Sequence, residues 1–344
     1  MIERVCISMN SVCNLKCTYC YFFLEPDRLP GPDDLTQQEL GTILRRIDAY
    51  SRRPEVTKRI KVNFVGSGEP LMKWRDIHAS IVRLREELPD HTLRWYTVTN
   101  GLLLTDRIIT EMKEVGLTPS VSLDGPASIH DQVRLTHNGK GSHAAVVRGI
   151  QRLRDAGFSV AINTTLSREV IAGLEQVFDF IEEHHFDKVI FDRLVDVPPE
   201  HAVSTAEFYA TLQRLAELKD ERGLAWLEVG NLEAYRRALN GKPDRVCTMF
   251  GSTCGAGFNN VIYMQREVYP CGRNFGQPEW VLGRFDDPLE LFPRRMAEKV
   301  GGPGCGGAEP EPVWGPDCLI ERRSDTYDRD SRPGFVRWLQ GRST

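Results

Sequence analysis

The stretch SMNSVCNLKCTYCYF, residues 8–22, packs three cysteines into eight positions near the start of a 344-residue chain. Cys13, Cys17 and Cys20 are an odd set, because a structural zinc site takes four ligands and a disulfide takes two. On a helix they would share one face but spread over about 10 Å of its axis. A β-type run precedes them and aromatic residues follow, which favours a loop wrapped around a compact cluster. Thiolates are the usual ligands of iron–sulfur clusters, and three thiolates leave one of four irons open.

An alternation of strand-like and helix-like segments extends outward from this stretch. Six β-type runs are expected at 5–12, 60–68, 93–101, 118–125, 158–166 and 187–197. Helical patterns separate them at 35–51, 74–88, 106–116, 143–157 and 170–185, with Thr36 and Glu39 as a capping pair and Gly116 as a stop. Such alternation indicates a parallel sheet with helices outside. Six strands are too few for a closed eight-stranded barrel, so the sequence predicts an α/β fold, an open partial (β/α)6 barrel with ligands at the carboxyl ends of its strands.

The pattern changes after the sixth strand. Two helices are expected at 205–223 and 231–240, and from Cys247 onward glycine and proline become frequent and regular periodicity fades. Such a segment has little core of its own and would need bound metal to hold it. We therefore expect a barrel at 1–200, a helical linker at 201–243 and a cysteine-rich extension at 244–344.

Charge and composition exclude several classes of partner. The net charge is −4 and no run of about 18 apolar residues occurs, so neither nucleic acid nor a membrane is an expected partner. The N-terminus has no apolar signal core, which favours a cytoplasmic protein. Nine cysteines fall into two groups instead of spreading as in a disulfide scaffold, which favours metal sites. The front group is Cys6, Cys13, Cys17 and Cys20, with Cys6 expected to be buried and inert, and the back group is Cys247, Cys254, Cys271, Cys305 and Cys318.

The front cysteines resemble those of a known family. The spacing C-x3-C-x2-C after the first strand of a partial barrel is similar to that of the radical S-adenosylmethionine (radical SAM) superfamily. The resemblance implies that Cys13, Cys17 and Cys20 hold a catalytic [4Fe–4S] cluster whose open iron binds S-adenosylmethionine. It also implies a flavodoxin-type or ferredoxin-type electron donor and reductive cleavage to a 5′-deoxyadenosyl radical, which abstracts hydrogen from a substrate.

Further family-like segments fall at the ends of expected strands. GSGEP (66–70) looks like the family's GGEP motif, with Ser67 in place of a glycine, and its glycines would let the backbone approach the cofactor. TNG (99–101) ends the third strand, and SLDGP (122–126) with HDQVR (130–134) resembles the segment in which a serine and an arginine hold the cofactor carboxylate. A plain turn and simple core packing of the tyrosines are the alternatives. The resemblance implies cofactor contacts from Tyr19, Tyr21, Gly66, Ser67, Gly68, Glu69, Asn100, Ser122, Arg134 and Asn163.

The back cysteines resemble those of one subgroup, the maturases whose SPASM or twitch region carries auxiliary [4Fe–4S] clusters. CGAG (254–257) and YPC (269–271) are family-like, and a hairpin turning at 265–267 is expected between them. A full SPASM region holds two clusters, for which five back cysteines are too few. We expect one auxiliary [4Fe–4S] cluster, with a zinc site as the alternative. Its expected ligands are Cys247, Cys254, Cys271 and one of Cys318 or Cys305, with Cys318 preferred.

The sequence leaves the substrate open. The subgroup implies a ribosomally made precursor peptide that is cross-linked or epimerised. A second hypothesis is an anaerobic sulfatase-maturing enzyme, although that branch has an aspartate base after the YPC cysteine, where this chain has Gly272. A third is a twitch-type dehydrogenase or mutase acting on a small molecule. A non-enzymatic iron–sulfur scaffold would have no need of the cofactor motifs.

Two expectations concern partners and proton transfer. Because the first strand begins close to Met1, we expect a precursor's leader to be recognised by a separate leader-binding protein or by the tail. A general base must lie within hydrogen-bond reach of the reacting group. The candidates for this base lie on or near segments that are expected to face the cavity, and they are Asp192, Arg193, Asp196 and Arg273. For Asp192, the favoured expectation is that its side chain points outward into a salt bridge.

Overall fold

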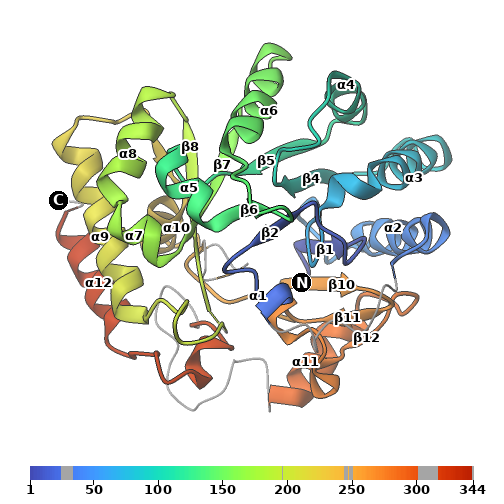
Figure 1. Cartoon of the computed structure of the whole chain (residues 1–344). Coiled ribbons are helices and arrows are strands. Elements are labelled where there is room, and N and C mark those ends of the chain that lie inside the picture. The colour runs from blue at the N-terminus through green and yellow to red at the C-terminus, as the bar shows by residue number, and fades with distance from the viewer. Residues whose placement is uncertain (25–33, 196, 244–246, 248–250, 301–316, 343–344) are drawn as a thin grey trace.

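The computed structural model describes residues 1–24, 34–195, 197–243, 247, 251–300 and 317–342. Its largest element is a ten-stranded sheet in the order β12-β11-β10-β1-β3-β4-β5-β7-β8-β9. Figure 1 shows the sheet curving, with most helices along its outer side. The prediction of an α/β fold with a parallel sheet and outer helices is confirmed.

The six strands of the predicted barrel are present and neighbouring strands run parallel. The first and last of them, β1 and β8, lie apart in the strand order, so the barrel of the described residues is open. The strands are β1 (Arg4–Ser8), β3 (Lys61–Phe64), β4 (Arg94–Thr99), β5 (Thr118–Ser122), β7 (Ala161–Leu166) and β8 (Lys188–Arg193).

The outer helices begin and end where local sequence signals predict. In α2 (Gln37–Ser51), Thr36 Oγ1 accepts from the Glu39 N–H at 3.2 Å, and Glu39 Oε2 accepts from the Thr36 N–H at 2.9 Å. This reciprocal pair is the predicted capping box. α4 (Asp106–Val115) ends at Gly116, whose φ of +67° suits glycine. The other helices of this layer are α3 (Trp74–Glu87), α6 (His143–Asp155), and α7 (Arg168–Ala172) with α8 (Leu174–Glu183), which together replace the single helix expected at 170–185.

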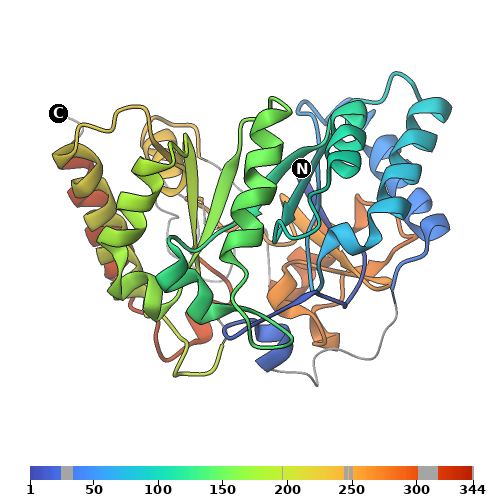
Figure 2. The ribbon, with the colours of Figure 1, turned by 45° about the horizontal axis from the view of Figure 1, so that its top comes forward.

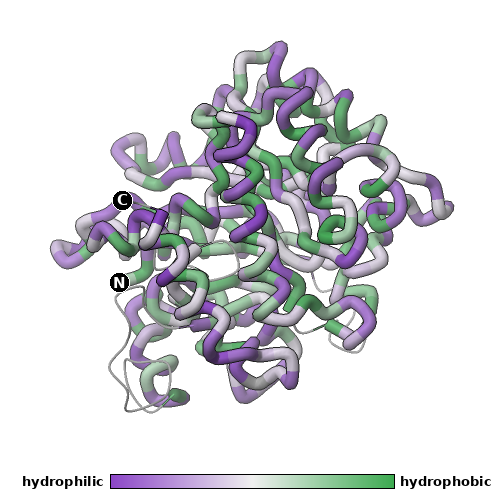
Figure 3. Tube along the Cα trace, turned by 90° about the vertical axis from the view of Figure 1, so that its left-hand side faces the viewer, coloured by the Kyte–Doolittle hydropathy of each residue, from purple (hydrophilic) through white to green (hydrophobic). Residues whose placement is uncertain are grey.

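Alternate side chains of the strands enter two different environments. Val5 and Ile7 of β1 and Phe191 of β8 are fully buried in the hydrophobic core that the helices cover. The residues between them face the concave side of the sheet, where polar side chains such as Asn163 and Asp192 meet. Figure 3 shows apolar segments running through the interior and hydrophilic segments along the outline. The concave, inner face of the sheet is therefore polar, whereas the face covered by the helices is apolar.

The back cysteines belong to segments that extend the barrel sheet. β10 (Asn260–Met264) pairs parallel with β1, and β11 (Glu267–Tyr269) pairs antiparallel with β10. This is the expected hairpin, although Glu267 belongs to β11 and not to the turn. Gln265 in the turn has a φ of +54°. β12 (Gly283–Arg284) completes this side, so the segment after residue 243 shares a sheet with the first strand of the chain.

The C-terminal helix lies at the opposite end of the sheet. There β9 (Glu228–Val229) pairs with β8, and α9 (Thr205–Glu221), α10 (Gly230–Leu239) and α12 (Ser331–Gly341) pack together. Figures 1 and 2 both show α9 and α12 side by side. The segment after residue 243 thus contributes to both ends of the open barrel, and the three-part division of the chain stays a prediction.

Short elements complete the described chain. None of its helices is both long and apolar enough to cross a membrane. The remaining elements are β2 (Leu15–Cys17), β6 (Arg134–Thr136), α1 (Tyr21–Leu24), α5 (Ala127–Val133), α11 (Leu291–Val300) and the 3-10 turns η2 (Pro70–Lys73), η3 (Gly272–Asn274), η4 (Pro278–Trp280) and η5 (Glu321–Arg323).

Candidate active site

The front cysteines lie on a loop interrupted by one short strand, not on a helix. Cys17 ends β2, which pairs antiparallel with β6 so that Cys17 lies opposite Arg134. The pKa of the Cys13 thiol is raised to about 11 and that of Cys17 to about 12, chiefly by burial and in smaller part by the charge of Cys20. Such thiols ionise only when a cation compensates them, which fits ligation of iron. Within the described residues, no three His, Cys, Asp or Glu side chains gather as they would around a single metal ion.

A buried carboxylate, that of Asp124, joins two of the predicted cofactor residues. Its Oδ2 accepts from the Tyr19 hydroxyl at 2.6 Å and from Arg134 Nε at 2.8 Å. Its Oδ1 accepts from the Thr165 N–H at 2.8 Å, and Asp124 is fully buried. The arginine also lies 5.5 Å from the Tyr19 ring centroid. The SLDGP motif contains Asp124, but only the burial of Arg134 shows that this carboxylate is the partner a buried arginine requires.

The serine predicted to share the cofactor carboxylate with Arg134 lies elsewhere on the inner face. Ser122 ends β5 opposite Asn163 of β7 and is half-buried. In the part of the chain that the structure describes, no hydrogen bond joins it to Arg134, whose Nη2 donates instead to Thr165 Oγ1 at 3.5 Å. Their joint role in binding the cofactor stays a prediction.

The GSGEP and TNG segments meet at the Glu69 carboxylate. Glu69 is buried and accepts from Thr99 Oγ1 at 2.6 Å, from the Asn100 N–H at 2.8 Å and from the Leu71 N–H at 3.1 Å. Burial raises its pKa. Asn100 Nδ2 donates to Asn14 Oδ1 at 2.6 Å and lies 3.8 Å from Cys13 Sγ. Glu69 therefore fixes the residue that contacts the cysteine loop.

The glycines of GSGEP are needed for packing within the chain. A Cβ at Gly66 would lie 2.2 Å from Ser8 Cβ, and one at Gly68 would lie 2.4 Å from the Val12 carbonyl oxygen. Ser67 is buried with its hydroxyl 3.0 Å from that of Ser8. In the structure these glycines allow a close approach to residues 8–12. The sequence analysis instead predicts that they allow a close approach to the cofactor. Because this loop lies against the segment before Cys13, it supports the cysteine loop.

Asn163 and Asp192 form a polar pair on the inner face. Asn163 Oδ1 accepts from the Ser120 hydroxyl, and its Nδ2 donates to Asp192 Oδ2 at 3.1 Å. The expectation that Asp192 points outward into a salt bridge is wrong. The residues on either side of it in β8 point outward into the core beneath the helices, so Asp192 itself points inward. Burial raises the pKa of Asp192 to about 6, whereas Asn163, Arg4 and Arg134 lower it and Asp124 raises it.

Asp192 allows a test by pH. Its folded-state pKa lies above the ordinary value, so its ionisation destabilises the fold as pH rises from about 4 to about 7. We expect Asp192→Asn to raise the free energy of unfolding by about 1–3 kcal/mol at pH 8, a range reduced for the partial exposure of the side chain. The gain should shrink below about pH 5, which urea unfolding at several pH values would measure. An equal gain at both ends of this range would contradict it.

Four of the five back cysteines line one small cavity. They are Cys247, Cys254, Cys271 and Cys318, and Arg273 lines the same cavity. The pKa values of Cys271 and Cys318 are raised to about 12, chiefly by burial and in smaller part by the charge of Cys254. Cys254 and Cys318 are buried and Cys247 and Cys271 are half-buried. Four thiols in one place are a suitable donor set for a [4Fe–4S] cluster. Cys305 and Asp196 lie outside the described residues.

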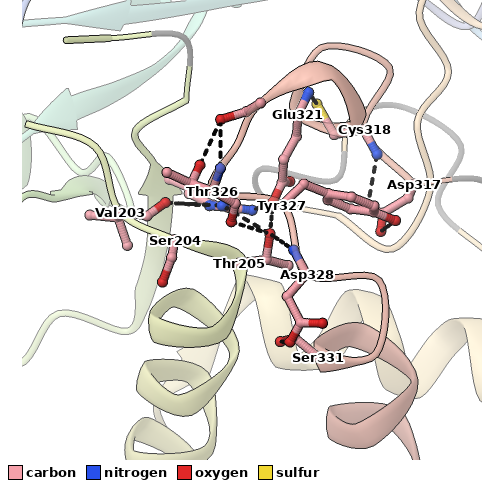
Figure 4. A network of polar contacts seen from close by, with 12 residues as sticks. Val203, Ser204, Thr205, Asp317, Cys318, Glu321, Thr326, Tyr327, Asp328 and Ser331 are labelled. Carbon is pink, nitrogen blue, oxygen red and sulfur yellow. Dashed lines mark hydrogen bonds and ion pairs between the residues drawn. The ribbon is translucent and has the colours of Figure 1, made fainter. Parts of the chain in front are cut away.

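A buried polar network holds the segment that carries Cys318 (Figure 4). The Arg193 guanidinium pairs with Glu321, and the two side chains are 2% and 5% exposed. Arg193 Nη2 also donates to the Val203 carbonyl at 2.9 Å, and Thr205 donates to Glu321. The Glu321 N–H lies 3.5 Å from Cys318 Sγ. Arg193, a candidate base from the sequence, is thus on the outer side of β8 and ties it to the last back cysteine.

Breaking this buried pair should cost far more than breaking an exposed one. Arg193→Met leaves the Glu321 carboxylate buried without its partner, so we expect the free energy of unfolding to fall by about 3–5 kcal/mol. The control is Lys188→Met, which removes the half-exposed pair with Glu228 and should cost at most about 1 kcal/mol. Urea unfolding of both variants would measure this, and equal losses would contradict it.

The sequence of the region that builds this site identifies the family. Residues 7–181 match the family described as the Radical SAM superfamily. The chain belongs to this superfamily. It is accordingly an enzyme, and its cofactors are a [4Fe–4S] cluster and S-adenosylmethionine.

Two curated relatives extend the similarity past residue 181. The serine-type anaerobic sulfatase-maturating enzyme of Bacteroides thetaiotaomicron is 28% identical over 302 residues, which are 80% of this chain and 70% of the relative. The AdoMet-dependent heme synthase of Nitratidesulfovibrio vulgaris is 32% identical over 331 residues, which are 88% of this chain and 83% of the relative. The chain spans less than half of two other curated relatives, 47% and 43% of their lengths.

Solved structures share the fold at lower identity. The structure described as native anSMEcpe with bound AdoMet and Cp18Cys peptide has a TM-score of 0.72 at 18% identity, covering 85% of this chain and 80% of that chain. Streptococcus suis SuiB bound to precursor peptide SuiA has a TM-score of 0.61 at 16% identity, covering 85% of this chain and 64% of that chain. The predicted resemblance to radical SAM maturases is confirmed by these folds together with the sulfatase-maturating relative.

Proposed function

We propose that this radical SAM enzyme abstracts a hydrogen atom from a peptide or protein substrate, with one auxiliary [4Fe–4S] cluster on the back cysteines. The observation that carries the proposal is the cavity lined by Cys247, Cys254, Cys271 and Cys318. The sulfatase-maturating relative matches 80% of this chain, which is more than the radical SAM segment at residues 7–181 alone. An auxiliary cluster beside a radical SAM site is the arrangement that the maturase resemblance implies.

Each part of the front site has a separate task in this proposal. When bound, the cluster and S-adenosylmethionine would supply the radical chemistry of hydrogen abstraction. Cys13, Cys17 and Cys20 would hold the iron. Asp124 orients Arg134 and Tyr19, and a guanidinium so fixed suits a carboxylate of the cofactor. Asp124, Arg134 and Tyr19 are all buried, so this part of the site is poorly solvated.

The substrate would meet the polar inner face of the sheet. Ser122, Asn163 and Asp192 lie there on three successive strands. Burial raises the pKa of Asp192 to about 6, which suits a group that takes up a proton during an oxidation. The position after Cys271 is Gly272, so a base like that of the sulfatase-maturing branch is missing there and Asp192 is the candidate to replace it. A precursor peptide that becomes cross-linked or epimerised is the substrate class we favour.

Isotope transfer tests the proposal without knowledge of the product. The protein would be reconstituted with iron under anaerobic conditions, and about eight irons per chain are expected for two clusters. S-adenosylmethionine and dithionite should then release 5′-deoxyadenosine. With synthetic peptides deuterated at candidate positions, including sulfatase-type peptides with cysteine or serine and any precursor encoded beside the gene, deuterium should appear in the 5′-deoxyadenosine. Failure of every peptide to transfer deuterium, despite active cleavage, would contradict a peptide substrate.

A second candidate substrate is an iron tetrapyrrole. The observation that favours it is the 32% identity to the heme synthase over 88% of this chain. The same assay decides between the two, because haem precursors deuterated in their side chains can replace the peptides. Label transferred from the tetrapyrrole, and not from the peptides, would select this alternative.

The proposal includes two protein partners. A flavodoxin-type or ferredoxin-type protein would deliver the electron that dithionite replaces in the assay. A separate leader-binding protein would present a precursor peptide. Adding each candidate partner should raise the rate of 5′-deoxyadenosine release or deuterium transfer.

A further inference from the structure

The segments that carry the front and back cysteines are docked against each other. Tyr21 directly follows Cys20, and its hydroxyl donates to the Gly272 carbonyl oxygen at 3.4 Å. The next residue, Phe22, meets Phe275 edge to face with ring centroids 6.3 Å apart. Figure 1 shows α1 close to β10 and β11. The two candidate cluster sites are therefore neighbours across a shared wall, which consists of Tyr21, Phe22, Gly272, Arg273 and Phe275.

One arginine lies in that wall. Arg273 belongs to η3, two residues after Cys271, and is 8% exposed. Its guanidinium carbon lies 3.9 Å from the centroid of the Tyr21 ring, which is a close cation–π contact. It also lines the cavity of the back cysteines. The arginine thus contacts the residue after the last front cysteine while facing the auxiliary site.

The Arg273 guanidinium lies beside both groups of cysteines. It contacts the ring of Tyr21, which directly follows Cys20, and it lines the cavity of the four back cysteines. A guanidinium keeps its positive charge even in a buried position. The geometry therefore places one fixed cation next to both sites.

We propose that Arg273 is a shared counter-ion that stabilises the reduced state of both iron–sulfur clusters. Reduction adds one negative charge to a cluster, and a nearby fixed cation in a poorly solvated wall favours that state. The inference rests on the auxiliary cluster of the proposed function. It makes Arg273 a positioning residue, because it acts through the clusters and on no reacting atom.

The glycine before Arg273 belongs to the same arrangement. A Cβ at Gly272 would lie 3.4 Å from the Tyr21 hydroxyl oxygen and 3.7 Å from Ile262 Cδ1, which are ordinary contacts. A side chain is therefore sterically acceptable at this position. An aspartate there would place a negative charge next to Arg273 and oppose its effect. Gly272→Asp is thus a second way to weaken the shared cation without removing it.

Redox titration of the fully loaded enzyme, followed by electron paramagnetic resonance without any substrate, tests the proposal. We expect Arg273→Gln to make both clusters about tenfold harder to reduce, a fall of about 59 mV for a one-electron couple. Arg273→Lys should restore most of the shift, because it keeps the charge. Arg154→Gln is the control, since Arg154 makes a cation–π contact 4.6 Å from the Phe186 ring, away from all described cysteines.

The outcomes separate this inference from the proposed function. A wild-type chain that holds about four irons contradicts the auxiliary cluster before any potential is measured. About eight irons with potentials that do not move, or with only one that moves, overturn the shared role of Arg273 alone. If Arg273→Gln fails to retain its iron, Gly272→Asp decides, and both potentials should fall in it as well.

Discussion

Cys17→Ala should abolish the release of 5′-deoxyadenosine and lower the iron content from about eight to about four atoms per chain. Cys17 pairs across β2 and β6 with Arg134, so its thiol lies at the centre of the front site. Loss of one ligand from a three-thiolate set leaves only two, and the cluster is not retained. The measurement is iron analysis together with chromatography of the reaction with S-adenosylmethionine and dithionite.

Two matched variants make that result specific. Cys6→Ala removes a half-buried thiol of β1 whose Sγ lies 3.7 Å from Asn260 Oδ1, and it should change neither quantity. Cys271→Ala should lose about four irons and yet release 5′-deoxyadenosine, because the front site stays intact. A Cys17→Ala protein that keeps eight irons and cleaves the cofactor would contradict the assignment of Cys17 as a ligand of the front cluster.

Asp124→Asn is expected to have the second largest effect. The fully buried carboxylate neutralises Arg134 and accepts the Tyr19 hydroxyl, so its loss leaves a buried guanidinium without its anion. Such changes cost about 3–5 kcal/mol of stability. Because Arg134 also loses its orientation, we expect the affinity for S-adenosylmethionine to fall about 10-fold to 100-fold, the value of one charge-assisted hydrogen bond.

Urea unfolding and isothermal titration with S-adenosylmethionine would measure these two quantities. The control is Asp106→Asn, which removes an exposed carboxylate 3.8 Å from Arg152 and should change the unfolding free energy by less than about 1 kcal/mol. If Asp124→Asn bound the cofactor as tightly as the unchanged protein, the contact between Asp124 and Arg134 would have no role in cofactor binding.

Local signals in the sequence predicted much of the fold. The six barrel strands, the capping box at Thr36 and the glycine stop at Gly116 depend on neighbouring residues, so a short window contains the information. The loop at Cys13, Cys17 and Cys20 was predictable for the same reason, since a helix would spread the three thiols over about 10 Å, too far apart for one compact cluster. The pairing of β10 with β1 joins residues more than 250 positions apart, and no local pattern announces it.

The candidate site was predictable in its residues more than in their contacts. Motifs predict Arg134 and Tyr19, whereas the role of Asp124, the carboxylate that joins them, depends on burial that the sequence does not reveal. The direction of Asp192 was missed, because which face of β8 lies beneath helices follows from tertiary packing. The ion pair between Arg193 and Glu321 joins the sixth strand to the tail and could not be read from either segment alone.

The parallel contact between β10 and β1 has a consequence for anyone who divides this protein. A chain cut after residue 243 would lose β10 and leave the backbone donors and acceptors along one side of β1 exposed. Unprotected strand margins invite self-association, so the shortened barrel should precipitate or form oligomers even though it retains every front cysteine. Light scattering of the truncated chain would reveal this, and the tail would then serve as a shield for the first strand as well as a holder of metal.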